Sequence, residues 1–205
     1  MDDAASESAT RLATRLRELR ADLGLTLDAL AERAGVSRSM ISLVERGESS
    51  PTAAVLDRLA AGLGVTLASL FAEEERADAS PLARRADQVT WRDPQSGYVR
   101  RNLSPPGFPS PIELVEIELP AGAYVAYDLP RTALMVGVSQ QVWVLEGEIA
   151  LTVGEVTHVL EVGDCLAMRL DVPTAFRNTS DRPARYLVAL ATDPPPTAAR
   201  RRDAP

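Results

Sequence analysis

Leucines recur at a helical spacing near the start of the chain, at Leu12, Leu16, Leu19 and Leu23. Residues three or four apart lie on one face of a helix, so this pattern predicts an amphipathic helix that ends at Gly24. Four further apolar stripes follow, each after a residue suited to cap a helix: Thr26, Ser37, Thr52 and Thr66. The pattern predicts a small all-α unit of five helices over residues 11–72.

From residue 88 onward the helical period is replaced by short segments in which apolar and polar residues alternate. Turn-forming sequences separate these segments, including Pro105-Pro106-Gly107, Glu146-Gly147 and Gly163-Asp164. We expect strands over residues 88–91, 98–103, 112–119, 141–145, 148–153, 156–160, 165–169, 175–177 and 184–191. Short strands at this spacing are typical of an all-β sandwich or barrel.

Three segments show neither pattern. We expect residues 1–10 to be a disordered N-terminus, residues 73–81 to be a linker, and residues 193–205 to be a disordered tail, because all three lack core-forming side chains. The predicted organisation is therefore a multidomain α + β chain, with a helical domain over residues 11–72 and a β domain over residues 82–192.

The composition excludes several kinds of catalytic site. The chain of 205 residues has one cysteine, Cys165, and one histidine, His158, so a disulfide framework or a metal site with several imidazoles or thiolates cannot form within it. All 22 basic residues are arginines, which excludes Schiff-base lysine chemistry. We interpret His158 as structural or solvent-facing and Cys165 as an ordinary thiol. With no run of about 18 apolar residues and no signal-peptide pattern, we expect a cytoplasmic protein without membrane contact.

The formal net charge of −7 is unevenly distributed along the chain. Residues 11–47 carry seven arginines against five acidic residues, whereas residues 112–192 carry five arginines against eleven. The helical half is therefore mildly basic and the β half acidic. A basic helical half fits contact with the phosphates of a nucleic acid.

The second and third predicted helices are joined by a short turn at Gly35-Val36, which is the arrangement of a helix-turn-helix. In such a unit the second helix lies in the major groove of DNA, where an arginine can bind a guanine edge. With its apolar residues turned inward, the third helix exposes Arg38, Ser39, Ser42 and Arg46. The helix N-terminal amides after Thr26 and Ser37 suit phosphate oxygens. A unit this small covers few base pairs, so a homodimer on an inverted repeat of double-stranded DNA is expected.

Residues 12–71 resemble the xenobiotic response element (XRE) family of helix-turn-helix regulators. The motifs that carry the resemblance are Leu16-Arg17-Glu18-Leu19-Arg20, Gly24-Leu25-Thr26, Leu30-Ala31, Ala34-Gly35-Val36-Ser37, Ile41-Ser42, Glu45-Arg46-Gly47, Ser50-Pro51-Thr52, Gly64-Val65 and Leu70-Phe71. The resemblance implies that the fold is lambda-repressor-like. It also implies that Arg20 pairs with Glu45 and that Leu43 faces the groove, where it could contact a thymine methyl.

Residues 82–192 resemble the cupin barrel, a double-stranded β-helix. The motifs are Val142 to Gly154, Leu160-Glu161-Val162-Gly163-Asp164, and Val172-Pro173 followed by Asn178. Enzymatic cupins usually hold a metal with histidines and a glutamate. The resemblance places Gln140, Thr174 and the apolar segment Ala133–Val136 at those positions. An amide, a hydroxyl and aliphatic groups cannot hold a divalent cation, so we expect neither metal nor cofactor.

A barrel of this kind keeps a few polar groups among apolar walls, which is typical of a small-ligand pocket. The candidate lining residues are Leu134, Val136, Gln140, Val142, Met168, Thr174 and Phe176. Arg131, expected at the entrance, could pair with a carboxylate. The alternative is that these side chains simply fill the barrel.

These features together predict a sequence-specific DNA-binding transcriptional regulator whose metal-free cupin domain senses a small-molecule effector. Two alternatives from other classes remain. One is a metal-independent cupin enzyme with a regulatory DNA-binding head, and the other is an antitoxin-like module that binds another protein.

Overall fold

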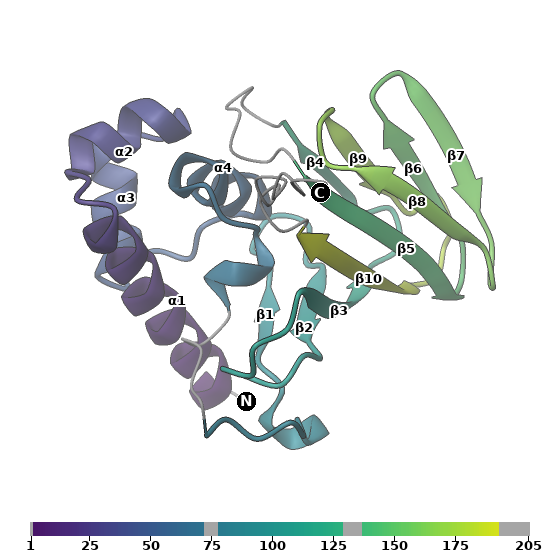
Figure 1. Ribbon diagram of the computed structural model, residues 1–205. Helices are drawn as coiled ribbons and strands as arrows, with labels where there is room; N and C mark the ends of the chain where they lie inside the picture. Colours follow the sequence, from purple (N-terminus) through teal and green to yellow (C-terminus); the bar gives the residue numbers. More distant parts are fainter. Residues whose placement is uncertain (1, 72–77, 129–136, 193–205) are drawn as a thin grey trace, which may run out of the picture.

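The computed structural model describes residues 2–71, 78–128 and 137–192. Helices form the first part of the chain and strands the second (Figure 1). The helices are α1 (Asp2–Asp22), α2 (Leu27–Ala34), α3 (Arg38–Glu45) and α4 (Ala53–Leu63), with short 3-10 helices η1 (Ala68–Leu70) and η2 (Arg85–Asp87). The strands are β1 (Thr90–Arg92), β2 (Val99–Asn102), β3 (Ile112–Leu119), β4 (Tyr124–Tyr127), β5 (Val138–Glu146), β6 (Ile149–Val153), β7 (Val156–Leu160), β8 (Cys165–Arg169), β9 (Thr174–Arg177) and β10 (Ala184–Thr192).

The three helices α2, α3 and α4 begin where the hydroxyl residues predict. In each, a side-chain oxygen satisfies a backbone amide that has no partner within the helix. The capping residues are Thr26, Ser37 and Thr52, which accept hydrogen bonds from the amides of Ala29, Met40 and Val55. The predicted start of each helix is therefore confirmed.

The predicted five helices are corrected to four. The segment after Thr66 forms only the 3-10 turn η1, whose backbone hydrogen bonds run from Ser69 to Thr66 and from Phe71 to Ala68, three residues apart. Helix α1 also begins at Asp2, within the segment 1–10 that we expected to be disordered. No glycine or proline interrupts the stretch from Asp2 to Asp22, so its backbone continues as a helix. No helix in the described part of the chain is long and apolar enough to cross a membrane.

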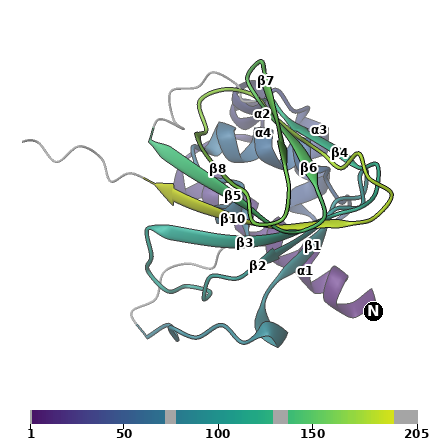
Figure 2. The same cartoon turned by 90° about the vertical axis from the view of Figure 1, so that its right-hand side faces the viewer.

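The strands form two sheets instead of a closed barrel. One has the order β1-β2-β3-β10-β5-β8 and the other the order β4-β9-β6-β7. Their end strands are not hydrogen-bonded to the other sheet, so the predicted barrel is corrected to two facing sheets. Figure 2 shows the two sheets inclined to one another, with α4 behind them. Gly147 makes the tight β5–β6 turn at φ +75°, where an added Cβ would lie 3.0 Å from the backbone of Ala184.

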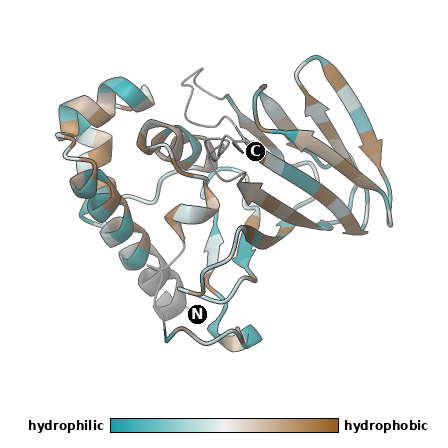
Figure 3. Ribbon diagram, viewed as in Figure 1, coloured by the Kyte–Doolittle hydropathy of each residue, from teal (hydrophilic) through white to brown (hydrophobic). Residues whose placement is uncertain are grey.

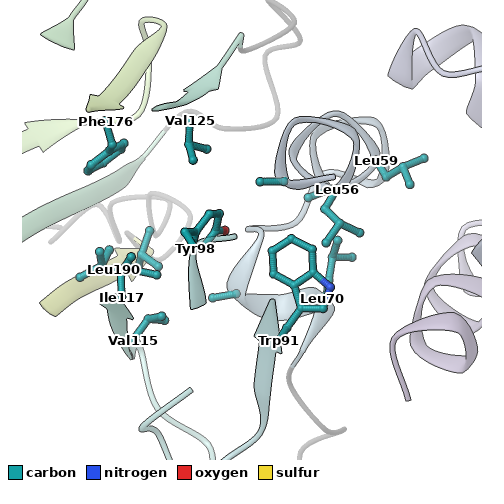
Figure 4. Close-up of a cluster of buried hydrophobic side chains, with 14 of the residues drawn as sticks. Leu56, Leu59, Leu70, Trp91, Tyr98, Val115, Ile117, Val125, Phe176 and Leu190 are labelled. Carbon is teal, nitrogen blue, oxygen red and sulfur yellow. The ribbon is translucent and has the colours of Figure 1, made fainter. Parts of the chain in front are cut away.

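The helical and β parts share one hydrophobic core. Helix α4 is apolar on most of its surface and buries eight of its residues (Figure 3). In Figure 4, Leu56 and Leu70 lie beside Trp91, and Tyr98 lies between them and the residues of the two sheets. The ring of Trp91 packs on Phe71 with 5.8 Å between centroids and on Tyr98 with 5.6 Å. A shared core of this kind fixes the position of α4 relative to the β sheets.

Two polar contacts also fix the helical part to the strands. The backbone amide of Ala53, at the start of α4, donates a buried hydrogen bond of 2.9 Å to Asp93 Oδ1. The hydroxyls of Thr66 and Ser69 donate to Glu113 on β3 at 2.9 and 3.2 Å. A carboxylate at a helix N-terminus is favoured by the helix dipole, so Asp93 holds the start of α4 to the loop after β1.

Candidate DNA interface and effector cavity

The surface of α3 is set by its packing. Ile41 and Val44 are buried against the rest of the helical part, and Met40 is half-buried. This leaves the opposite stripe toward solvent, as the sequence predicts. Of the predicted contact residues, Thr26, Ser37, Arg38, Ser39 and Arg46 are exposed, and Ser42 and Leu43 are half-buried.

The orientation of α3 is fixed from α1 by a two-pronged ion pair. Arg20 Nε and Nη2 donate to Glu45 Oε1 and Oε2 at 2.6 and 2.8 Å, and Arg20 Nη1 donates to the Leu25 carbonyl at 2.8 Å. The hydrogen bonds that Arg20 donates to Glu45 raise the pKa of the Arg20 guanidinium above its ordinary value. The pair that the family resemblance implied is therefore present, and it connects the first and third helices.

Two arginines of the exposed stripe have acidic partners close by. Arg38 Nε lies 3.2 Å from Asp28 Oδ1. Arg46 donates from Nε and Nη2 to the two carboxylate oxygens of Glu48, each at 2.7 Å, and its Nη1 also contacts the Ser42 hydroxyl. The hydrogen bond from Arg46 lowers the pKa of the Glu48 carboxyl. Because these pairs are exposed, they are weak, and phosphate oxygens or a guanine edge can replace the carboxylates.

A cavity of about 60 Å³ lies between the helical part and the cupin strands. Three of the predicted pocket residues meet there: Gln140, Thr174 and Phe176. Val142 is fully buried and Met168 is half-buried, but neither lines this cavity. Arg131, Leu134 and Val136 fall outside the described residues.

The cavity also contains residues that the sequence did not single out. They are Asp57, Thr66 and Leu67 from the helical part, and Arg100, Ile117, Tyr127, Leu170, Tyr186, Val188 and Leu190 from the β part. Arg100 alternates with Arg101 along β2, but among the described residues only Arg101 has acidic and amide partners, Glu116 and Gln88. Arg100 is buried and lies over the ring of Phe71, which is distant in the sequence, so no local pattern reveals its burial.

The donor set at the cavity does not fit a catalytic metal. Gln140 and Thr174, which the cupin resemblance aligns with metal-ligand positions, offer one amide and one hydroxyl at the cavity. Within residues 9–71, 78–128 and 137–192, no group of three His, Cys, Asp or Glu side chains could hold an ion. Cys165 is exposed on β8 and His158 is half-buried on β7.

Both parts of the chain match families of known proteins. The helix-turn-helix family model matches residues 16–70, and the cupin domain model matches residues 138–190. An uncharacterized HTH-type transcriptional regulator from Methanothermobacter thermautotrophicus is 47% identical over 51 residues, which are 25% of this chain and 74% of that protein. The chain belongs to the helix-turn-helix (XRE) family of transcriptional regulators.

The similarity extends through both halves of this XRE-family regulator. The HTH-type transcriptional regulator SutR from Escherichia coli is 29% identical over 175 residues, which cover 85% of this chain and 91% of SutR. The crystal structure of an HTH_3 family transcriptional regulator from Vibrio cholerae superposes with a TM-score of 0.70 at 27% identity, covering 93% of this chain and 99% of that one. The regulator therefore combines a helix-turn-helix with a cupin domain, as the sequence motifs indicated.

Proposed function

We propose that this regulator binds a specific operator in double-stranded DNA as a homodimer in the cytoplasm, and that its cupin domain senses a small molecule without catalysing a reaction. The observation that carries the DNA-binding part is the exposed stripe of α3, held in place by the Arg20–Glu45 pair. A helix presented in this way fits the major groove, with Arg38 placed near its N-terminus to bind a base edge. The support for sensing in place of catalysis is the cavity with Gln140 and Thr174 at the ligand positions of metal-binding cupins.

Substituting Arg38 with alanine is expected to weaken binding to the operator by about tenfold or more, because an arginine–guanine pair discriminates by about 1–3 kcal/mol in each half-site. The operator would first be selected from random duplexes by the full-length protein, and affinities then measured by fluorescence anisotropy at fixed salt. Arg182→Ala is the matched control, since it removes the same charge from an exposed turn of the cupin part. Failure to enrich any sequence, or equal losses for the two variants, would contradict the proposal.

The outer face of the six-stranded sheet supports the homodimer. The strand register places Leu114, Trp143, Leu187 and Ala189 on the face opposite the buried residues Val142 and Val188. Trp143 is 48% exposed and Leu114 is 39% exposed. Exposed apolar side chains on one sheet face, here beside the polar Glu116 and Gln141, fit a protein interface.

Replacing Trp143 with glutamate is expected to convert the dimer into a monomer, because the charge would be buried without a partner in the interface. Sedimentation velocity across a range of concentrations measures the change. The matched control is Val159→Glu, which places the same charge on exposed β7 of the other sheet. A wild-type chain that sediments as a monomer, or a dimer unaffected by Trp143→Glu, would rule out this face.

A further inference from the structure

The cavity of about 60 Å³ is built by both domains, not by the cupin part alone. Asp57 on α4, together with Thr66 and Leu67 after it, forms one wall, and strands of both sheets form the others. One water-sized group needs about 10–15 Å³ of such space, so the cavity has room for about four to six non-hydrogen atoms. Any molecule bound there contacts the DNA-binding part directly.

Arg100 provides a positive charge at this cavity. Its residue is 5% exposed, and its Nε and Nη2 have no hydrogen-bond partner among the residues that the structure describes. Its guanidinium carbon lies 5.6 Å from the centre of the Phe71 ring, which stabilises the charge but accepts none of these hydrogen bonds well. A buried guanidinium without an anionic partner is costly, and its planar fork matches the two oxygens of a carboxylate.

Asp57 does not serve as the missing partner of Arg100. It is 7% exposed, and its Oδ2 also has no hydrogen-bond partner within the described ranges. The pKa of its carboxyl is raised to about 7, chiefly by burial and to a smaller extent by Asp128, with Arg58 opposing. Among the described residues no hydrogen bond or ion pair joins Asp57 to Arg100, so the Arg100 guanidinium has no carboxylate partner at the cavity.

We propose that this cavity binds a small organic monocarboxylate, whose two oxygens accept hydrogen bonds from Arg100 while Asp57 and the tyrosine hydroxyls surround the rest of the molecule. This inference rests on the proposed sensing function and names the class and location of the effector. A single negative charge balances the single guanidinium. A phosphate dianion would leave excess negative charge beside the buried carboxyl of Asp57.

The position of the cavity provides a route from the ligand to the DNA-binding surface. Helix α4 packs against α2, the helix before α3. At their contact an added Cβ on Gly62 would lie 2.9 Å from the Ala34 Cβ, so the two helices touch without space between them. A ligand that changes how α4 rests on the sheets therefore also moves α2. By linkage, operator DNA must in turn change the affinity for the carboxylate.

The first test is binding of defined probes to the full-length protein, measured by calorimetry and thermal shift. Acetate, glycolate, lactate and pyruvate are the probes, acetamide is the uncharged match for acetate, and inorganic phosphate is the competing anion. We expect at least one carboxylate to raise Tm with concentration and to change the affinity for the selected operator, while acetamide does neither. Binding of phosphate in preference to every carboxylate, or no response to any carboxylate, would overturn the proposal.

The second test separates a binding role of Arg100 from a structural one. In Arg100→Met the buried charge is replaced by an apolar chain, so we expect the carboxylate response to fall at least tenfold while Tm without ligand stays equal or rises. Arg101→Met is the matched control on the same strand, and it should keep the carboxylate response. Unchanged carboxylate binding by Arg100→Met, or a fall in its Tm without ligand, overturns the assignment. Operator binding by Arg100→Met without ligand is measured in parallel, so that loss of sensing is distinguished from loss of DNA binding.

Discussion

Between pH 4 and pH 8 the free energy of unfolding of the wild type is expected to fall by about 4 kcal/mol relative to that of Asp57→Asn. Burial is the largest cause of the raised pKa of Asp57, which is about 7 against an ordinary 3.8. Nearby Asp128 raises this pKa further, and Arg58 partly lowers it. The folded protein therefore keeps a proton on Asp57 over a range in which the unfolded chain has lost it.

The direction of the pH dependence follows from this difference in bound protons. Between about pH 4 and pH 7 the folded state binds more protons than the unfolded state, so the contribution of Asp57 to the free energy of unfolding falls as pH rises. Below pH 4 both states are protonated and the penalty is absent, whereas above pH 7 it is complete. Asparagine does not titrate, so the variant lacks this slope.

Urea unfolding of wild type and Asp57→Asn at several pH values between 4 and 8 measures this effect. Asp181→Asn is the control, because that side chain is 96% exposed and its removal should leave the slope unchanged. Parallel pH profiles for wild type and Asp57→Asn would show that Asp57 titrates normally in the folded protein. That result would also weaken the charge argument for the cavity.

The contrast between Asp57 and the helix caps shows which features the sequence could predict. Thr26, Ser37 and Thr52 act on amides three residues away, so a local pattern is enough to locate them. Asp57 is different, because it lies on α4 and faces strands from a distant part of the chain. Polar residues on a helix ordinarily indicate a solvent-exposed face. Asp57 is buried because α4 packs on the sheets, and the local sequence does not show this packing.

The same reason explains the errors within the β part. Strand β4, at Tyr124–Tyr127, is not among the predicted strands, because its sequence Tyr-Val-Ala-Tyr shows no alternation of apolar and charged residues. It is defined by its pairing with β9, where Val125 lies opposite Phe176. The closed barrel was wrong for a related reason, since closure depends on whether distant edge strands meet. The cupin resemblance predicts Gln140 and Thr174, Phe176 is expected to face the same cavity as Thr174, and the structure brings all three to one cavity.

The second large effect concerns the ion pair between α1 and α3. Glu45→Ala is expected to lower the free energy of unfolding by about 3 kcal/mol, near the lower end for a buried pair that loses one partner. The Arg20 side chain is 17% exposed and that of Glu45 is 7%, so the guanidinium left behind would be only partly hydrated. For a chain of this size the loss corresponds to a fall in Tm of about 6–12 °C. Operator affinity should fall as well, because α3 loses its connection to α1.

The chain contains its own control for the Arg20–Glu45 pair. Arg46 and Glu48 form the same two-pronged geometry, but their side chains are 51% and 53% exposed. Glu48→Ala should therefore cost far less stability, since the Arg46 guanidinium that remains stays hydrated. The double variant Arg20→Met/Glu45→Met is expected to recover much of the loss seen in Glu45→Ala, because neither charge is then buried alone. Equal losses for Glu45→Ala and Glu48→Ala in urea unfolding would mean that burial does not set the strength of the pair. Recovery of stability without recovery of operator binding would show that the charges are needed to orient α3 as well as to hold it.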